Sequence, residues 1–234
     1  MTRPHFMAQS YPSFSDDPAA WFGRHQQRVT QVGIGVGVIG VLVWFGWSWQ
    51  ARKTAAANAA LDLARSTAEA SNLSAAAGQF QQIIERYKGT DAADQAVIAL
   101  NQVRMINGQF ELAAVNLRSF LATNPNARFA VPANGLLGAA LESAGRSADA
   151  GAAYAEASRL ADLPYLKADY LLQAGKAYIL AGKADLASAA LDTVIVKYKD
   201  TPVYTEAVIR LAEMTKGAAP KGSDAVARLP QTTY

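Results

Sequence analysis

The chain has 234 residues, a formal net charge of +3 and a hydrophobic share of 51%. That share is too low for a polytopic membrane protein, so one anchored domain is favoured. The 22 basic residues are nearly balanced by 19 acidic ones and give no strong positive field for a phosphate backbone, so nucleic-acid binding is not favoured. The absence of cysteine excludes disulfides, thiolate metal sites and cysteine nucleophiles.

Residues 1–28 are predicted to form an N-terminal arm. Its prolines and aromatic residues follow no helical or strand period, which is typical of a segment without a stable element. Asp17 followed by Pro18 has the pattern of a helix N-cap and a first-turn proline, so a helix is expected to begin there. In one interpretation the aromatic side chains of the arm rest on the lipid surface, and in the other they dock on a neighbouring membrane protein.

Residues 29–51 are predicted to form a transmembrane helix. No residue between Arg28 and Arg52 carries a formal charge, and this stretch would extend about 34 Å as a helix, enough to cross a hydrocarbon core of about 30 Å. A cleaved signal peptide is the competing interpretation, but its apolar region and its charged leader would both be shorter. Aromatic residues are expected at the two lipid interfaces: Trp21, Phe22, Trp44, Trp47 and Trp49.

The charges beside this segment predict its orientation. Arg24 and Arg28 lie on a short arm close to the membrane, whereas Arg52 and Lys53 begin a long domain whose charges count for less in topology. The arm is therefore expected in the cytoplasm. In a bacterium this places the chain in the inner membrane with its larger domain in the periplasm.

Glycines inside the segment suggest a second role for it. Gly33 and Gly37 have the GxxxG spacing, which lets another helix approach closely in lipid, although glycine is also common in membrane helices without this role. A formal GxGxxG match begins at Gly35. A dinucleotide site is excluded because such a motif must follow a strand and open a helix in water.

A period of 37 residues runs through the remainder of the chain. Gly108, Gly145 and Gly182 are each 37 residues apart, and one more step back reaches Ser71. The fifth residue after each of these four anchors is alanine and the ninth is large: Ala76 and Phe80, Ala113 and Leu117, Ala150 and Tyr154, Ala187 and Leu191. Seven residues before the last two anchors stand Gly138 and Gly175. Each period is expected to form a helix, a tight turn and a second helix, packed closely through its small residues.

This pattern resembles the tetratricopeptide repeat over roughly residues 55–216, with Pro125 matching the proline that closes a unit of that family. The period is 37 rather than 34, and the large aromatic residue of the first helix is replaced by Val97, Asn134 and Leu171. The expected fold class is all-α: one N-terminal transmembrane helix, then an α-solenoid of about four such hairpins over residues 52–216, with a capping helix over residues 203–214. Residues 217–234 lack a pattern and are expected to be a flexible tail.

The repeat region does not have the composition of an active site. It contains no histidine and no cysteine, and its carboxylates are scattered singly along the helices. Asp91 and Asp94 come closest to a pair, but they fall in a first helical turn, where acids favour the positive end of the helix dipole, so a metal site is disfavoured. We therefore expect no catalytic residues, no metal, no cofactor and no small-molecule substrate.

Proteins and the lipid bilayer are the expected partners. The resemblance implies a concave groove lined by the first helix of each hairpin, with these residues: Gln95, Gln102, Met105, Glu142, Asp169, Lys176 and Ile179. This set is mixed in charge and lacks the basic pair that would clamp a chain-terminal carboxylate, which leaves the class of ligand open.

The full layout, a short arm, one membrane helix ending in Phe45-Gly46-Trp47 and then helical repeats, resembles the ancillary subunit of the bacterial Sec translocon. That resemblance implies a scaffold that tethers soluble partners or client proteins to an inner-membrane complex. The alternative is an accessory structural subunit of another large membrane complex, such as a respiratory or photosynthetic one. An outer-membrane assembly lipoprotein with similar repeats is excluded, because the chain has no cysteine to carry the lipid.

Overall fold

The computed structural model describes residues 18–215, and within them it contains nine α-helices and no strand. The chain divides into two compact units, residues 1–53 and residues 54–234, which are treated separately below. Most of the arm, residues 1–17, and the predicted tail lie outside the described residues. The all-α prediction is confirmed for the described part.

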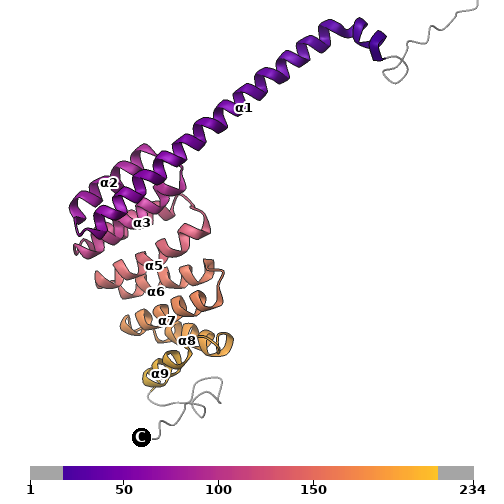
Figure 1. Ribbon diagram of the computed structural model, residues 1–234. Helices are drawn as coiled ribbons and strands as arrows, with labels where there is room; N and C mark the ends of the chain where they lie inside the picture. The colour runs from indigo at the N-terminus through magenta and orange to yellow at the C-terminus, as the bar shows by residue number, and fades with distance from the viewer. Residues whose placement is uncertain (1–17, 216–234) are drawn as a thin grey trace, which may run out of the picture. The chain divides into compact units, whose positions relative to one another are not determined.

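The first unit consists of the N-terminal part of helix α1 (Pro18–Glu69), coloured indigo in Figure 1. The helix begins at Pro18, the predicted start. Large apolar side chains of this unit are between 53% and 76% exposed: Ile34, Val38, Ile39, Val41, Leu42, Val43, Trp44, Phe45, Trp47 and Trp49. The predicted interface residues Trp21 and Phe22 and the predicted packing residue Gly33 lie on this helix, where the structure describes their backbone alone. Among residues 18–215, no helix combines the length and the apolar character needed to cross a membrane.

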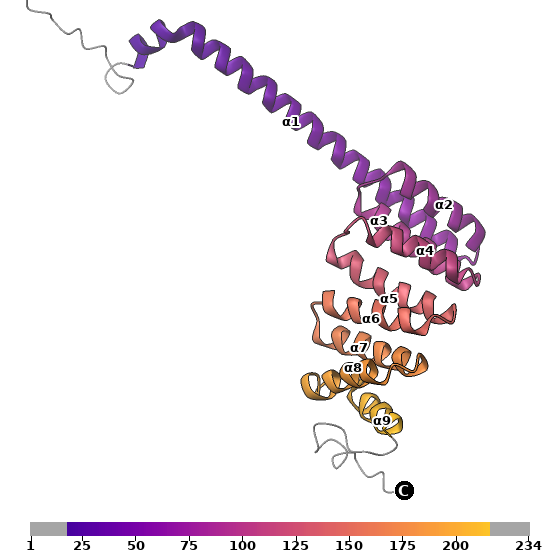
Figure 2. The ribbon, with the colours of Figure 1, turned by 180° about the vertical axis from the view of Figure 1, so that it is seen from behind.

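The second unit is a stack of helices that pack against one another in chain order, as both views show (Figures 1 and 2). It contains the end of α1 and then α2 (Leu73–Arg86), α3 (Asp91–Ile106), α4 (Phe110–Leu121), α5 (Ala127–Ser143), α6 (Ser147–Leu160), α7 (Pro164–Leu180), α8 (Ala184–Lys197) and α9 (Tyr204–Met214). Helices two apart in the chain also touch: α3 contacts α5, and α7 contacts the last helix, α9. This repeated packing fits an α-solenoid.

The four turns inside the hairpins share one geometry. Ser71, Gly108, Gly145 and Gly182 have φ angles of 62°, 71°, 75° and 68°, in the left-handed region that favours glycine. In each turn the next backbone N–H donates to a carbonyl five residues earlier, for example from Arg146 to Leu141 over 2.8 Å. This bond closes a Schellman motif and satisfies a carbonyl at the helix end.

Close helix contacts lie between the small and large residues of the period. The four alanines are fully buried, and the large residues are buried with them. A Cβ atom added to Gly138 would lie 2.6 Å from the ring of Tyr154, and one added to Gly175 would lie 2.8 Å from Leu191. The ring and the leucine side chain therefore occupy the space that a methyl group would need, which brings α5 against α6 and α7 against α8.

The last helix covers the end of the stack. Helix α9 buries Ala207, Val208 and Leu211 against residues of α7 and α8, and Met214 is half-buried beside them. The β-branched run of Val194 to Val196 lies in the last turn of helix α8. A single strand at this place would have had no second strand to pair with.

Replacing Gly138 by alanine tests this packing. The added methyl would overlap the Tyr154 ring, so Gly138→Ala is expected to lower the free energy of unfolding by about 1–3 kcal/mol. Gly78 is the matched control, since it lies exposed within α2 with nothing within 4 Å of an added Cβ. There the same change should stabilise by about 0.5–1 kcal/mol through helix propensity. Urea unfolding followed by circular dichroism measures both, and equal effects would contradict the close contact.

Candidate binding pocket on the first helices

A cavity in the second unit lies on the face formed by the first helices of the hairpins. Its volume is about 710 Å³, within the range of ligand pockets. The end of α1, helix α3 and the start of α5 line it with these residues: Arg65, Ala68, Glu69, Gln95, Ile98, Ala99, Gln102, Val103, Ile106, Arg128, Phe129 and Pro132, with Leu73 and Phe80 contributed by α2. Most of these side chains are apolar, so the pocket has a hydrophobic floor and a polar rim.

Two arginines that line the pocket are held in place by neighbours. An Nη atom of Arg65 donates to Oε1 of Gln95 over 2.7 Å, joining α1 to α3. The guanidinium of Arg128 lies 4.6 Å from the centre of the Phe129 ring and forms an ion pair with Asp91. Partial burial, then Asp91, raises the pKa of the Asp94 carboxyl above its usual value, and Arg128 opposes this effect.

Only part of the predicted groove comes together in this pocket. Gln95 and Gln102 line it, whereas Met105 does not line it and packs half-buried against the core. The remaining four predicted residues lie on the later helices. Ile179 packs against the core, and Nζ of Lys176 forms an ion pair with Glu206 over 3.4 Å, joining α7 to α9.

The predicted residues Glu142 and Asp169 lie near the buried Tyr154 and the half-buried Tyr170. The hydroxyl of Tyr154 donates to Glu142 over 3.1 Å. Burial, followed by the charge and hydrogen bond of Glu142, raises the pKa of Tyr154 well above its ordinary range, and Asp169 adds to this shift. Burial and Asp169 likewise raise the pKa of Tyr170, whose ring lies against Gly135.

The pocket contains residues that sequence reasoning missed, and the 37-residue register could have found one of them. A step of 37 back from Gln102 reaches Arg65, which occupies the equivalent place on the preceding first helix. Arg128 and Phe129 carried no such signal. Their place in the pocket depends on how α5 packs against α3.

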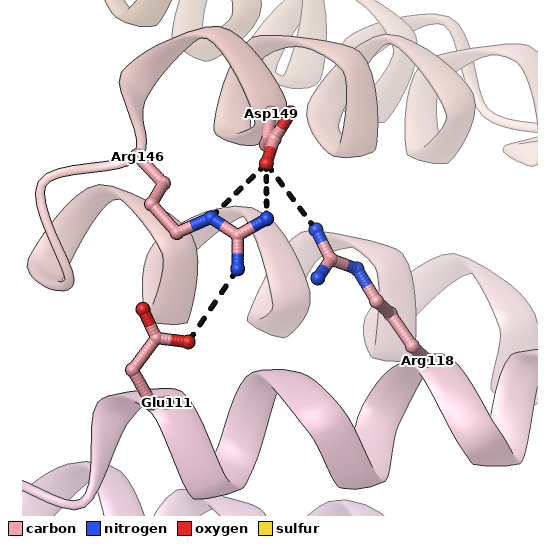
Figure 3. A network of polar contacts seen from close by, with 4 residues as sticks. All are labelled: Glu111, Arg118, Arg146 and Asp149. Carbon is pink, nitrogen blue, oxygen red and sulfur yellow. Dashed lines mark hydrogen bonds and ion pairs between the residues drawn. The ribbon is translucent and has the colours of Figure 1, made fainter.

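A second group of polar contacts lies on the other helices of the hairpins (Figure 3). Arg146 contacts Asp149 over 2.5 Å and Glu111 over 3.5 Å, and Arg118 reaches Asp149 over 3.5 Å. These residues join α4 to α6. All four side chains are more than a third exposed, so the network contributes little to stability and fits a structural role.

Nowhere between residues 18 and 215 do three or more metal-ligating side chains gather into a site. Asp91 and Asp94 lie in the first turn of α3, and Asp91 is paired with Arg128. No family model and no curated protein matches this sequence.

The Tyr154 hydroxyl allows a test of the polar contact between α6 and α5. Tyr154→Phe keeps the ring on Gly138 but removes the donor to Glu142, so it is expected to lower the free energy of unfolding by about 0.5–1.5 kcal/mol at neutral pH. Because folding raises the pKa of this hydroxyl, its contribution is fully present below the ordinary value of 10.0 and is lost as the pH rises above it.

The wild type should therefore lose more stability above pH 10.0 than Tyr154→Phe does. Thermal melts between neutral pH and pH 11, followed by circular dichroism, make the comparison. Tyr165 is the control, because it lies exposed at the start of α7 and its replacement by phenylalanine should leave the pH profile unchanged. Parallel alkaline losses in wild type and Tyr154→Phe would contradict the assignment.

Proposed function

We propose that the chain is a membrane-anchored scaffold that binds other proteins. The observation that carries the proposal is the apolar stretch of α1 between residues 34 and 49, whose large side chains are exposed and which contains no charged residue. A helix that is hydrophobic on all sides requires a nonaqueous surrounding. The full sequence from Val29 to Ala51 is uncharged, which supports a transmembrane helix over residues 29–51.

The proposed location is the bacterial inner membrane. Arg24 and Arg28 on the short arm support a cytoplasmic N-terminus, and the second unit then lies in the periplasm. Trp44, Trp47 and Trp49 at the end of the apolar stretch suit the lipid interface on the periplasmic side.

The proposed binding module is the second unit, as four hairpins of the tetratricopeptide type with α9 as the cap. Its pocket combines an apolar floor with arginine and glutamine side chains, the composition of a surface that binds protein segments. Within this proposal the scaffold tethers soluble partners or client proteins to an inner-membrane complex, and the resemblance of the layout favours the Sec translocon.

The second candidate is an accessory structural subunit of another large membrane complex. Gly35, Gly37 and Gly40 have nothing within 4 Å of an added Cβ, so a neighbouring helix could approach α1 closely at these positions. In this case the apolar stretch, rather than the pocket, holds the partner.

Charged substitutions in the apolar stretch test the anchor. The double variant Val38→Asp, Val41→Asp places two carboxylates at the bilayer centre, at a cost of about 2.5–3.5 kcal/mol each, and is expected to move the chain from the membrane to the soluble fraction. Leu112→Asp with Val115→Asp is the control, since both side chains lie exposed on α4. Sedimentation after carbonate washing reads the outcome. A wild-type chain that stays soluble without detergent would refute the anchor.

Removal of the second unit separates the two candidates. If the chain is a tether, deletion of residues 54–234 should remove its cross-linked partners, as detected by mass spectrometry on native membranes. Partners that remain bound to residues 1–53 would support the structural subunit instead.

A further inference from the structure

We propose that the loop between α2 and α3, which exposes Arg86 and Lys88, binds the phosphate groups of anionic lipids in the bilayer that anchors the chain. This inference deepens the proposed function and rests on the anchor over residues 29–51. Its support comes from three observations: the short chain connection to the anchor, the positive charge that the loop exposes and the fixed backbone of the loop.

The connection between the proposed anchor and the second unit is short. The uncharged stretch ends at Ala51, and the second unit begins at Thr54. Three residue steps span at most about 11 Å, whatever path the chain takes. The headgroup layer on each side of the hydrocarbon core is itself about 5–8 Å thick. The start of the second unit therefore lies in or next to the headgroups.

The first hairpin places the loop beside that start. Ala57 of α1 and Ile83 of α2 share one buried cluster, and the tight turn at Ser71 reverses the chain between the two helices. Ala56 and Arg86 are each fifteen residues from Ser71, so antiparallel helices with the same rise per residue bring them to the same level. Because packed helix axes lie about 8–10 Å apart, the loop lies at the end of the unit where the chain arrives from the anchor.

The charge exposed by this loop is positive. Arg86 and Lys88 are exposed, and Arg86 forms no ion pair within residues 18–215. Glu85 is the sole acid in the sequence between residues 70 and 90. Asp91, which follows the loop, forms an ion pair with Arg128. Carboxylates therefore offset only part of the positive charge.

The connection itself adds further positive charge. Arg52 and Lys53 are the two residues between the uncharged stretch and Thr54. Lysine and arginine bind phosphate oxygens through charge-assisted hydrogen bonds, and four or more basic residues beside a membrane helix are typical of segments that attract anionic lipids. A phosphate-bearing headgroup is therefore the partner that fits the loop.

The backbone of the loop is fixed by its own contacts. Gly89 has a φ angle of 81°, in the left-handed region that favours glycine. The buried Thr90 hydroxyl donates to the Tyr87 carbonyl over 2.8 Å and accepts from the N–H of Ala93 over 3.3 Å. The Tyr87 side chain packs half-buried against the core. The two basic residues flank this tyrosine, so little backbone freedom is lost when they bind.

A matched loop recurs later in the stack. Residues 197–199, Lys-Tyr-Lys, stand three periods of 37 residues after residues 86–88, Arg-Tyr-Lys. The Thr201 hydroxyl likewise donates to the Tyr198 carbonyl, over 2.6 Å. This loop follows α8 and has no short connection to the anchor. It therefore provides a control with the same number of basic residues and the same local hydrogen bond.

Fluorescence quenching in vesicles tests the inference on the full chain. The chain has no cysteine, so a single label can be attached at Gln82→Cys, on the exposed side of α2 one turn before Arg86. The vesicles carry a headgroup-linked quencher and contain phosphatidylcholine with or without phosphatidylglycerol. Phosphatidylglycerol should raise the ratio of quenched to unquenched label at least about fivefold, and added salt should reverse the rise. A label at Ser74→Cys, at the other end of α2, should not respond.

Charge variants test the location. Arg86→Gln with Lys88→Gln should abolish the rise caused by phosphatidylglycerol, whereas Lys197→Gln with Lys199→Gln should preserve it. All four side chains are exposed, so both pairs should melt like the wild type. If the first pair melts earlier, Lys88→Gln alone is used. No loss with the first pair, or an equal loss with the second, overturns the site.

Two further measurements identify the source of a failure. The rise should be the same in phosphate and chloride buffers of equal ionic strength, and its loss in phosphate alone would overturn a lipid headgroup in favour of the free ion. Flotation of the vesicles tests the anchor separately. A chain that floats while its label ignores phosphatidylglycerol refutes this inference and leaves the anchor standing. A chain that does not float refutes the anchor and, with it, the proposed function.

Discussion

The close approach of paired helices is the constraint on which the rest of the second unit depends. None of its amphipathic helices can bury its apolar face alone, so each must find a neighbour within side-chain reach. The chain meets this need with buried alanines at a fixed spacing and with glycines at which a ring or a leucine occupies the place of a methyl group. Tight turns then return the chain antiparallel, in register for the next pair.

Departures from this regular packing leave space between the helices. Where the period is strict, as at Gly138 and Gly175, the space between helices is filled and nothing can enter. A pocket of about 710 Å³ lies beside Ala68 and Ala99, at positions where the following hairpins have the larger Met105 and Leu136. Repetition stabilises the stack, and the pocket lies where the side chains depart from the repeat.

Polar groups divide into those that support the stack and those that are available for recognition. The buried amide of Asn101 donates to Val97 over 2.8 Å within α3, and the Glu111, Arg118, Arg146 and Asp149 network joins two outer helices. By contrast, Arg65 and Arg128 are positioned by neighbours beside an apolar floor. Arginine is therefore structural in the network between α4 and α6 and part of a candidate site in the pocket, because its neighbouring side chains differ between the two places.

The sequence by itself determined the hairpins. A left-handed turn needs glycine or a tolerant residue, and a close helix contact needs a small one, so Gly108, Gly145 and Gly182 marked the turns and the alanines marked the buried faces. These are local requirements, visible in one chain at a fixed spacing. Tertiary structure alone decided which side chains share the pocket, because Arg65, Gln95 and Phe129 come from three helices and meet only through packing. It also packed Met105 half-buried against the core beside this pocket rather than in its lining, since neighbouring helices decide how far each side chain is covered.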